Sequence, residues 1–81
     1  MQTIAIVRDI IRKISGVDLD DDDPLIMTHR IDSMDIIEIV SALEQEFNII
    51  IESEDIIMSN FDTVKKMSSY VSRKIFNDGR L

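Results

Sequence analysis

The sequence predicts an all-α fold, a bundle of three main helices and one short helix. Three separate stretches repeat apolar residues at intervals of three and four, which is the spacing of one buried helix face. The one run with strand character, Asn48–Ile51, has no second strand to pair with, so it predicts an extended link. A chain of 81 residues with 44% hydrophobic content fits one domain, residues 1–81, around one small core.

The first helix is expected from Thr3 to Ile14. Its apolar residues recur at helical spacing, and they are Ile4, Val7, Ile11 and Ile14. Thr3 is a candidate N-terminal cap. Gly16 is expected to end the helix, because glycine readily adopts the left-handed conformation of a C-terminal cap.

Residues Val17–Ile31 are predicted to form a loop with about one turn. The consecutive aspartates Asp20–Asp23 repel one another, and Pro24 lacks a backbone donor, so this stretch is unsuited to a helix interior. The apolar residues that are expected to pin the loop onto the core are Leu25, Ile26 and Ile31.

The clearest amphipathic helix is predicted for Ser33–Phe47. Its buried face is formed by Ile36, Ile39, Val40, Leu43 and Phe47. Asp32 is the expected cap, because its carboxylate can accept a hydrogen bond from a free N–H group of the first turn. Asp35 adds a second acid where the helix dipole is positive.

Two apolar residues of this helix, Met34 and Ile37, point away from the buried face and are expected to be exposed. Glu38, Glu44 and Glu46 make the outer surface acidic. The helix therefore presents a mixed apolar and anionic surface next to the Ser33 hydroxyl, and such a surface suits basic partners.

Two more helices are predicted after the extended link. A short helix is expected near Glu54–Met58, with Ser53 as its cap. The last helix is expected over Thr63–Phe76, with Asp62 as its cap and Asn77–Leu81 as a frayed tail. Its buried residues are predicted to be Val64, Met67, Val71 and Ile75, with Tyr70 at the flank of this face.

The charge distribution argues against nucleic acid as a partner. The net charge is −7 and the pI is near 4.4, whereas phosphate binding needs a basic face. From Asp18 to Asp62 there are fourteen acids and one base, Arg30, while the two ends together hold two acids and eight bases. The acids therefore gather around Ser33, and we expect partners with basic docking patches.

Several classes of protein are excluded or disfavoured. The chain has no cysteine and one histidine, so thiolate metal sites are excluded and no metal site is predicted. The aspartate-rich loop departs from a calcium-binding loop, because its sixth position is Asp23 rather than Gly and its twelfth is His29 rather than Glu. Weak divalent cation binding by these acids is left open.

Catalysis is also disfavoured. A nucleophilic serine needs a base, and the only imidazole, that of His29, precedes Ser33 by four residues without a Gly-x-Ser-x-Gly motif. No signal peptide and no run of membrane-spanning length is found. We expect a cytoplasmic monomer that does not insert into a membrane.

Residues Asp32–Phe47, which begin Asp-Ser-Met-Asp and contain Leu-Glu-x-x-Phe, resemble the signature of acyl carrier proteins. The similarity extends to Ile49, Ile51, the acidic stretch Glu52–Asp55, Thr63-Val64 and Tyr70-Val71, so it covers nearly the whole chain. With Met1 close to the first helix, the chain resembles the free-standing, type II members of this family.

The resemblance implies that Ser33, flanked by Asp32 and Met34, carries a 4′-phosphopantetheine arm that a phosphopantetheinyl transferase installs from coenzyme A. It implies a carrier of acyl thioesters, not an enzyme, serving partner enzymes of fatty acid, lipid or polyketide-type biosynthesis. The partner-binding residues that it implies are Asp35, Ile37, Glu38, Glu44, Glu52, Glu54 and Asp55.

One departure from the family pattern bears on the pathway, and two alternatives to an acyl carrier stay open. His29-Arg30 stand where the family usually has Leu-Gly, which bears on the pathway; Arg30 is a candidate partner for the phosphate of the arm. A carrier for amino-acyl or aryl groups is expected to show a Gly-Gly-x-Ser type motif, which Arg30–Ser33 does not. A small acidic helical adaptor that is never modified is the alternative from another class.

Overall fold

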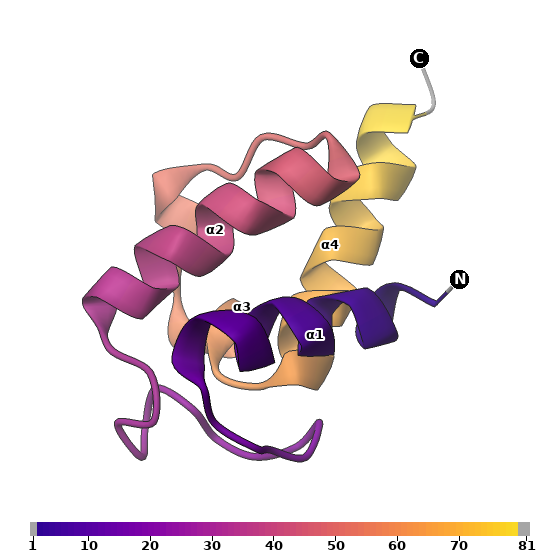
Figure 1. Ribbon diagram of the computed structural model, residues 1–81. Coiled ribbons are helices and arrows are strands. Elements are labelled where there is room, and N and C mark those ends of the chain that lie inside the picture. The colour runs from indigo at the N-terminus through magenta and orange to yellow at the C-terminus, as the bar shows by residue number, and fades with distance from the viewer. Residues whose placement is uncertain (1, 80–81) are drawn as a thin grey trace.

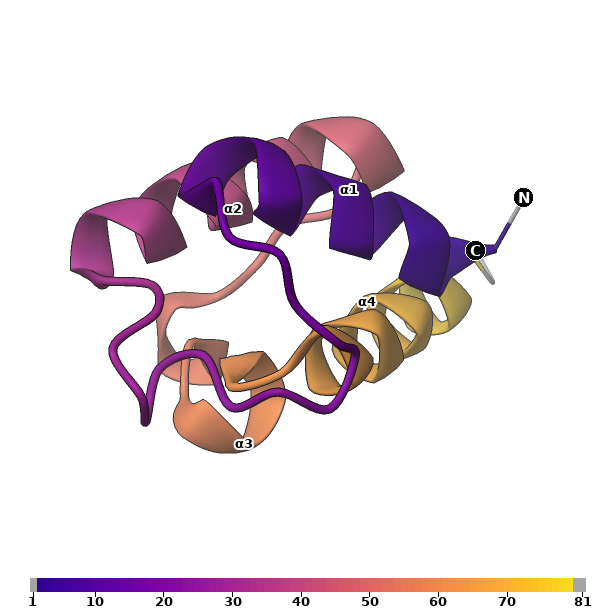
Figure 2. The ribbon, with the colours of Figure 1, turned by 60° about the horizontal axis from the view of Figure 1, so that its bottom comes forward.

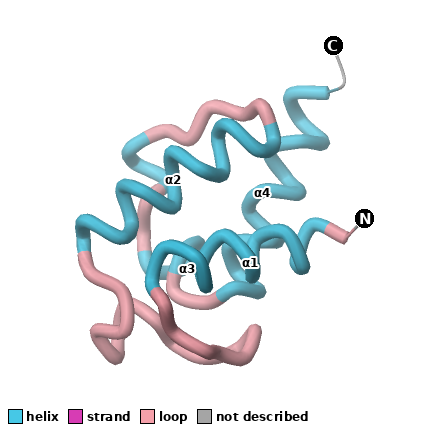
Figure 3. Tube along the Cα trace, viewed as in Figure 1, coloured by secondary structure: helices cyan, strands magenta, loops and turns pink. Residues whose placement is uncertain are grey.

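The computed structural model describes residues 2–79, and these form an all-helical bundle (Figures 1 and 3). Its elements are α1 (Thr3–Ser15), α2 (Ser33–Phe47), the 3₁₀ turn η1 (Ser53–Asp55), α3 (Met58–Phe61) and α4 (Val64–Gly79). No strand occurs in this part of the chain. The predicted fold class is confirmed, and the isoleucine run after α2 is a link, as predicted.

The three long helices surround one core. In Figure 1, α1 and α2 lie beside each other and run in roughly opposite directions, while α4 crosses both, and Figure 2 shows the same arrangement from below. Helix α1 packs against α2 and α4, and α3 packs against α4. The start of α1 and the end of α4 lie on one side of the bundle, and the Ser33 end of α2 lies on the other.

The core is made mainly of the predicted apolar faces. Val7 and Ile11 of α1 and Ile39 and Leu43 of α2 are fully buried. The other buried apolar residues are Leu19, Leu25, Ile31, Ile49, Ile51, Phe61, Val64, Met67, Tyr70 and Val71. Leu25 and Ile31 pin the long loop to the core, as predicted, and Ile26 packs partly buried against it.

The ends of α1 and α2 follow from local interactions. Gly16 adopts the left-handed conformation at φ 70° and donates its N–H to the Arg12 carbonyl, as the predicted C-terminal cap of α1. The prediction for Thr3 was wrong, because α1 begins at Thr3 after Gln2, which makes no side-chain capping bond. Helix α2 has the predicted bounds, Ser33–Phe47, and ends at Asn48 in the left-handed region.

The predicted cap of α4 was wrong by one residue. The Thr63 hydroxyl accepts a 2.9 Å hydrogen bond from the Lys66 N–H and so caps the helix that begins at Val64. Asp62 does not cap it, because its buried carboxylate accepts two backbone N–H groups of the long loop, those of Ile26 and Met27.

The C-terminal half of α4 also differs from the prediction. Ile75, expected to be buried, is 38% exposed, because the bundle no longer covers this part of the helix. The helix continues through Asn77 to Gly79, where the sequence predicted a tail, and Arg80 and Leu81 lie outside the described residues.

The predicted short helix occurs as α3, but it lies further along the chain and follows a separate 3₁₀ turn, η1. The prediction placed it near Glu54–Met58, but η1 ends at Asp55 and α3 begins at Met58. Ser53 lies inside η1 and makes no capping bond, so that prediction was wrong too. Tertiary contacts at both ends override helix propensity here, since Asp55 is bound to Tyr70 and Phe61 is fully buried.

Candidate functional site

Ser33 is the first residue of α2, and a capping box fixes it there. The Asp32 carboxylate accepts a 2.9 Å hydrogen bond from the Asp35 N–H, and the Asp35 carboxylate accepts a 3.2 Å bond from the Asp32 N–H. The predicted cap is therefore confirmed, and Asp35 adds its reciprocal half. Because both carboxylates are engaged in this box, Ser33 projects from a helix end of defined geometry.

The Ser33 hydroxyl is open to reaction. The residue is exposed, and its hydroxyl bonds to no other described residue. Within residues 2–79, the N–H groups of Ser33 and Met34 also have no acceptor, because they precede the first hydrogen bond of the helix. Free N–H groups and the positive end of the helix dipole favour an anion, such as a phosphate, at this position.

A largely apolar groove of about 410 Å³ lies beside Ser33. One wall comes from the loop that leads to α2, and its residues are Ile26, His29 and Ile31. The opposite wall comes from the segment between η1 and α3, and its residues are Ile56, Ile57 and Met58. Asp32, Ser33 and Ile36 complete the lining, so the groove opens at the serine.

The groove could not be predicted from the sequence, because its two walls are about thirty residues apart in the chain. Ile26 and Ile31 were assigned only to the core, and Ile57 and Met58 only to a short helix. The nearest sequence indication was the excess of large apolar residues in a segment too short to bury them all. It predicts exposed apolar surface without saying where that surface lies.

The segments that form this groove also carry exposed apolar side chains. Met34 and Ile37 are 68% and 64% exposed, so their predicted exposure is confirmed. Met27, Ile57 and Met58 are exposed as well, and sequence analysis missed them. We call these five residues the apolar rim, because each lines the groove or directly follows a lining residue in the sequence.

A comparison with protein families assigns residues 5–71 to the model described as the phosphopantetheine attachment site. The match covers most of the chain, from the first turn of α1 into the middle of α4. The chain belongs to this family of carrier proteins. Its members are carriers of a covalent 4′-phosphopantetheine and are not catalysts. A search among curated proteins gives no match.

The family assignment confirms the resemblance seen in Asp32–Phe47 and the predicted cofactor. The residues at the start of α2 fit the group, since an exposed hydroxyl, two free N–H groups and an apolar groove meet at Ser33. Among residues 2–79, none of the helices of the carrier combines the length and hydropathy needed to cross a bilayer.

The acidic side chains of the carrier differ in whether their carboxylates are free to contact a partner protein. Glu38, Glu52 and Glu54 are exposed, and no hydrogen bond or ion pair with a described residue holds their carboxylates. Glu44 instead accepts a 2.8 Å hydrogen bond from the Ile51 N–H, and Asp55 accepts a 2.7 Å bond from the Tyr70 hydroxyl. Glu44 and Asp55 therefore stabilise the fold of the carrier, whatever else they contact.

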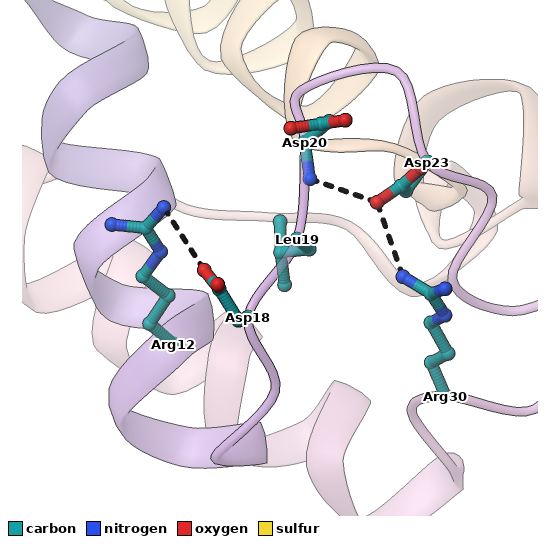
Figure 4. Close-up of a pocket in the computed structure, with 6 residues that line it drawn as sticks. All are labelled: Arg12, Asp18, Leu19, Asp20, Asp23 and Arg30. Carbon is teal, nitrogen blue, oxygen red and sulfur yellow. Dashed lines mark hydrogen bonds and ion pairs between the residues drawn. The ribbon is translucent and has the colours of Figure 1, made fainter.

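Arg30, the base in the acidic stretch, lies outside the Ser33 groove. It donates a 3.1 Å hydrogen bond to the Asp23 carboxylate, which also accepts the Asp20 N–H at 2.8 Å. Figure 4 shows Arg30 across from Arg12 in a second, polar groove of about 460 Å³, with Asp18 between them on the side of Arg12. The structure thus gives Arg30 an acidic partner within the loop.

Charged pairs offset part of the negative charge of the aspartate-rich loop. Arg8 forms a bidentate pair with Asp21 at 2.7 and 2.8 Å, and Arg12 lies 3.4 Å from Asp18. Lys65 lies 3.9 Å from Asp22. No group of three or more potential metal ligands is found among residues 2–79.

Proposed function

We propose that Ser33 is the residue that carries the 4′-phosphopantetheine and that this carrier transports acyl groups. The observation that supports the assignment is the exposed Ser33 hydroxyl at the start of α2, at the mouth of an apolar groove. The arm is attached by a phosphodiester to the Ser33 oxygen, at the positive end of the helix dipole. When attached, it supplies the terminal thiol that holds an acyl group as a thioester, since the chain itself has no cysteine.

The residues next to Ser33 orient the attachment point. Asp32 and Asp35 are held in the capping box, so the helix begins at Ser33 and the serine stays in the first turn. Their negative charges oppose a phosphate and favour an arm that extends into solvent. Met34 is exposed directly after the serine and offers an apolar contact to a modifying enzyme.

The chemistry of the groove favours acyl cargo over polar cargo. Its two walls are mostly isoleucine and methionine, and burial of an aliphatic chain against such side chains is favourable. An amino-acyl group brings a charged ammonium, which is costly to bury without a partner. Asp32 is the one acidic residue among those that line the groove. We therefore place the protein in fatty acid, lipid or polyketide-type biosynthesis, with an amino-acyl or aryl carrier as the alternative.

The proposed partner surface combines the apolar rim with the free acids. Ile37 and Glu38 lie on α2, and Glu52 and Glu54 lie at η1, so apolar contact and negative charge occur together. Asp35, Glu44 and Asp55 add charge to this surface from positions where they also hold the fold. We expect the phosphopantetheinyl transferase and acyl-transferring enzymes to dock through basic patches, with rapid, salt-sensitive association.

The deciding experiment is intact mass spectrometry after incubation with coenzyme A and a broad-specificity phosphopantetheinyl transferase. We expect a gain of one phosphopantetheine in the wild type and in Ser41→Ala, which removes another exposed serine of α2. Ser33→Ala is expected to show no gain. A gain in Ser33→Ala would overturn the assignment, and no gain in any chain with several transferases would favour an unmodified adaptor. A cytoplasmic location and a monomeric state are parts of this proposal.

A further inference from the structure

Asp62 binds both walls of the groove beside Ser33. Its carboxylate Oδ1 accepts hydrogen bonds from the Ile26 N–H at 2.9 Å and from the Met27 N–H at 3.1 Å, in the loop wall. Its own N–H donates to the Met58 carbonyl at 3.0 Å, in the opposite wall. The Asp62 backbone carbonyl also accepts a 2.7 Å hydrogen bond from the Leu25 N–H. One residue therefore joins the loop wall to the opposite wall, although the two are far apart in the sequence.

The Asp62 carboxylate is buried and bonded to the loop. It is 5% exposed, and a carboxylate so buried is tolerated only when hydrogen bonds replace its lost hydration. Bonds to an ionised acceptor are stronger than those between neutral groups, so the loop amides are held firmly. The neighbouring Thr63 hydroxyl caps α4, which leaves the Asp62 carboxylate free for the loop.

The other ties between the loop and the helices are ion pairs and one backbone hydrogen bond, from the Lys65 N–H to the Asp21 carbonyl at 3.0 Å. Asp18 and Asp22 pair with Arg12 and Lys65 at the exposed surface, where ion pairs contribute little and are screened by salt, whereas the bidentate Arg8–Asp21 pair is partly buried. These pairs hold the first half of the loop. The second half, which lines the groove and leads directly to Ser33, is fixed by Leu25 in the core and by Asp62.

We propose that Asp62 is a positioning residue that sets the width of the groove beside Ser33 by holding its two walls together. The inference rests on the proposed function only where it concerns the cargo, because a groove of fixed width shelters an acyl chain attached through Ser33. Without the carboxylate, the turn that carries Ile26 and Met27 is expected to move away from Met58 and open the groove to water.

The test compares Asp62→Ala with Thr63→Ala, a matched control that removes a buried hydrogen bond from the adjacent residue without touching the loop. The first measurement is amide hydrogen exchange in the unmodified protein, read at Ile26 and Met27 by NMR. Asp62→Ala is expected to speed both amides by roughly tenfold or more, while Thr63→Ala leaves them near the wild-type rate. Asp62→Asn keeps the Oδ1 acceptor and is expected to retain most of the protection.

The second measurement uses the protein loaded with an octanoyl thioester and follows cleavage of the thioester by hydroxylamine. Asp62→Ala is expected to be cleaved several-fold faster than Thr63→Ala. If Asp62→Ala does not fold, Asp62→Glu takes its place, because it keeps the charge but displaces the acceptor by one methylene.

Equal amide exchange in the Asp62 and Thr63 variants would overturn the positioning role. Equal cleavage despite different exchange would overturn the shelter of the acyl chain by a groove whose width Asp62 sets. A failure to load Ser33 would be seen by mass and would contradict the proposed function alone. In that case the exchange measurement still decides whether Asp62 holds the walls together.

Discussion

The Tyr70 hydroxyl donates a 2.7 Å hydrogen bond to the Asp55 carboxylate, fifteen residues earlier in the chain. Tyr70 is buried in α4, with its ring 5.5 Å from that of Phe61, whereas Asp55 ends η1. The bond therefore ties the turn before the groove wall Ile56–Met58 to the buried face of α4. It joins the segment that lines the groove beside Ser33 to the core.

Tyr70→Phe is expected to lower the free energy of unfolding by about 1 kcal/mol, because it removes this bond and leaves the half-buried Asp55 carboxylate without its partner. Urea unfolding of the unmodified protein measures the change. An unchanged midpoint would mean that water replaces the hydroxyl at no cost. Combining Tyr70→Phe with Asp55→Asn forms a double-mutant cycle that isolates the pair.

Tyr70 also predicts how the protein responds to alkali. Burial, together with the hydrogen bond to Asp55 and its charge, raises the pKa of the Tyr70 phenol above the usual value of 10. A raised folded-state pKa means that the unfolded chain loses its proton first. Stability from this group is therefore complete below about pH 10 and is lost as the pH rises above that value. Tyr70 is the only tyrosine, so phenolate absorbance reports its titration directly.

We expect the folded protein to show no phenolate absorbance until well above pH 10, with the change coincident with unfolding. In urea, the same absorbance should appear near pH 10. A folded-state titration at the ordinary value would show that Tyr70 is neither buried nor bonded to Asp55 in solution.

The Arg8–Asp21 pair predicts the response to acid. Its bidentate hydrogen bond and charge lower the pKa of the Asp21 carboxyl below its ordinary value. A lowered folded-state pKa gives stability that is present above the ordinary value, near 4, and is lost as the pH falls through the folded-state pKa. Arg8→Gln is thus expected to lower the melting temperature more at pH 7 than at pH 2. An equal loss at both values would indicate lost packing of the arginine stem instead.

Glu38 and Glu44 lie on the same helix but are expected to respond differently to mutation. Glu38→Gln removes an exposed carboxylate with no internal partner, so it should leave the melting temperature unchanged and raise the KM of the transferase several-fold at low salt. The difference should shrink at high salt, because screening weakens the charge interaction. Equal KM values at low salt would remove Glu38 from the docking surface.

Glu44→Ala is expected to lower the free energy of unfolding by about 1 kcal/mol, because the Ile51 N–H loses its acceptor. The amide proton of Ile51, in the link after α2, should then exchange faster. Glu46→Ala is the control, since Glu46 is exposed on the same helix and its carboxylate holds no described residue. If the two variants were equally stable, the Glu44 contact would contribute nothing to the fold.

The parts of the protein that the sequence determined are those decided within one or two helical turns. The bounds of α2 follow from the Asp32 cap, the apolar spacing up to Phe47 and the change of conformation at Asn48. The end of α1 follows from Gly16. The signature around Ser33 indicated the carrier family because its acids and its serine lie in consecutive positions.

Only the tertiary structure decided which hydrogen-bonding groups of distant segments pair with one another. Asp62 and Thr63 are both able to cap α4, and local rules do not choose between them; the amides of Ile26 and Met27, some thirty-five residues away, engage Asp62 and leave the cap to Thr63. The same holds for the groove beside Ser33, whose walls are distant in sequence. A hydrogen bond within a turn competes only with its neighbours, whereas these pairings depend on which distant groups the folded core brings within reach.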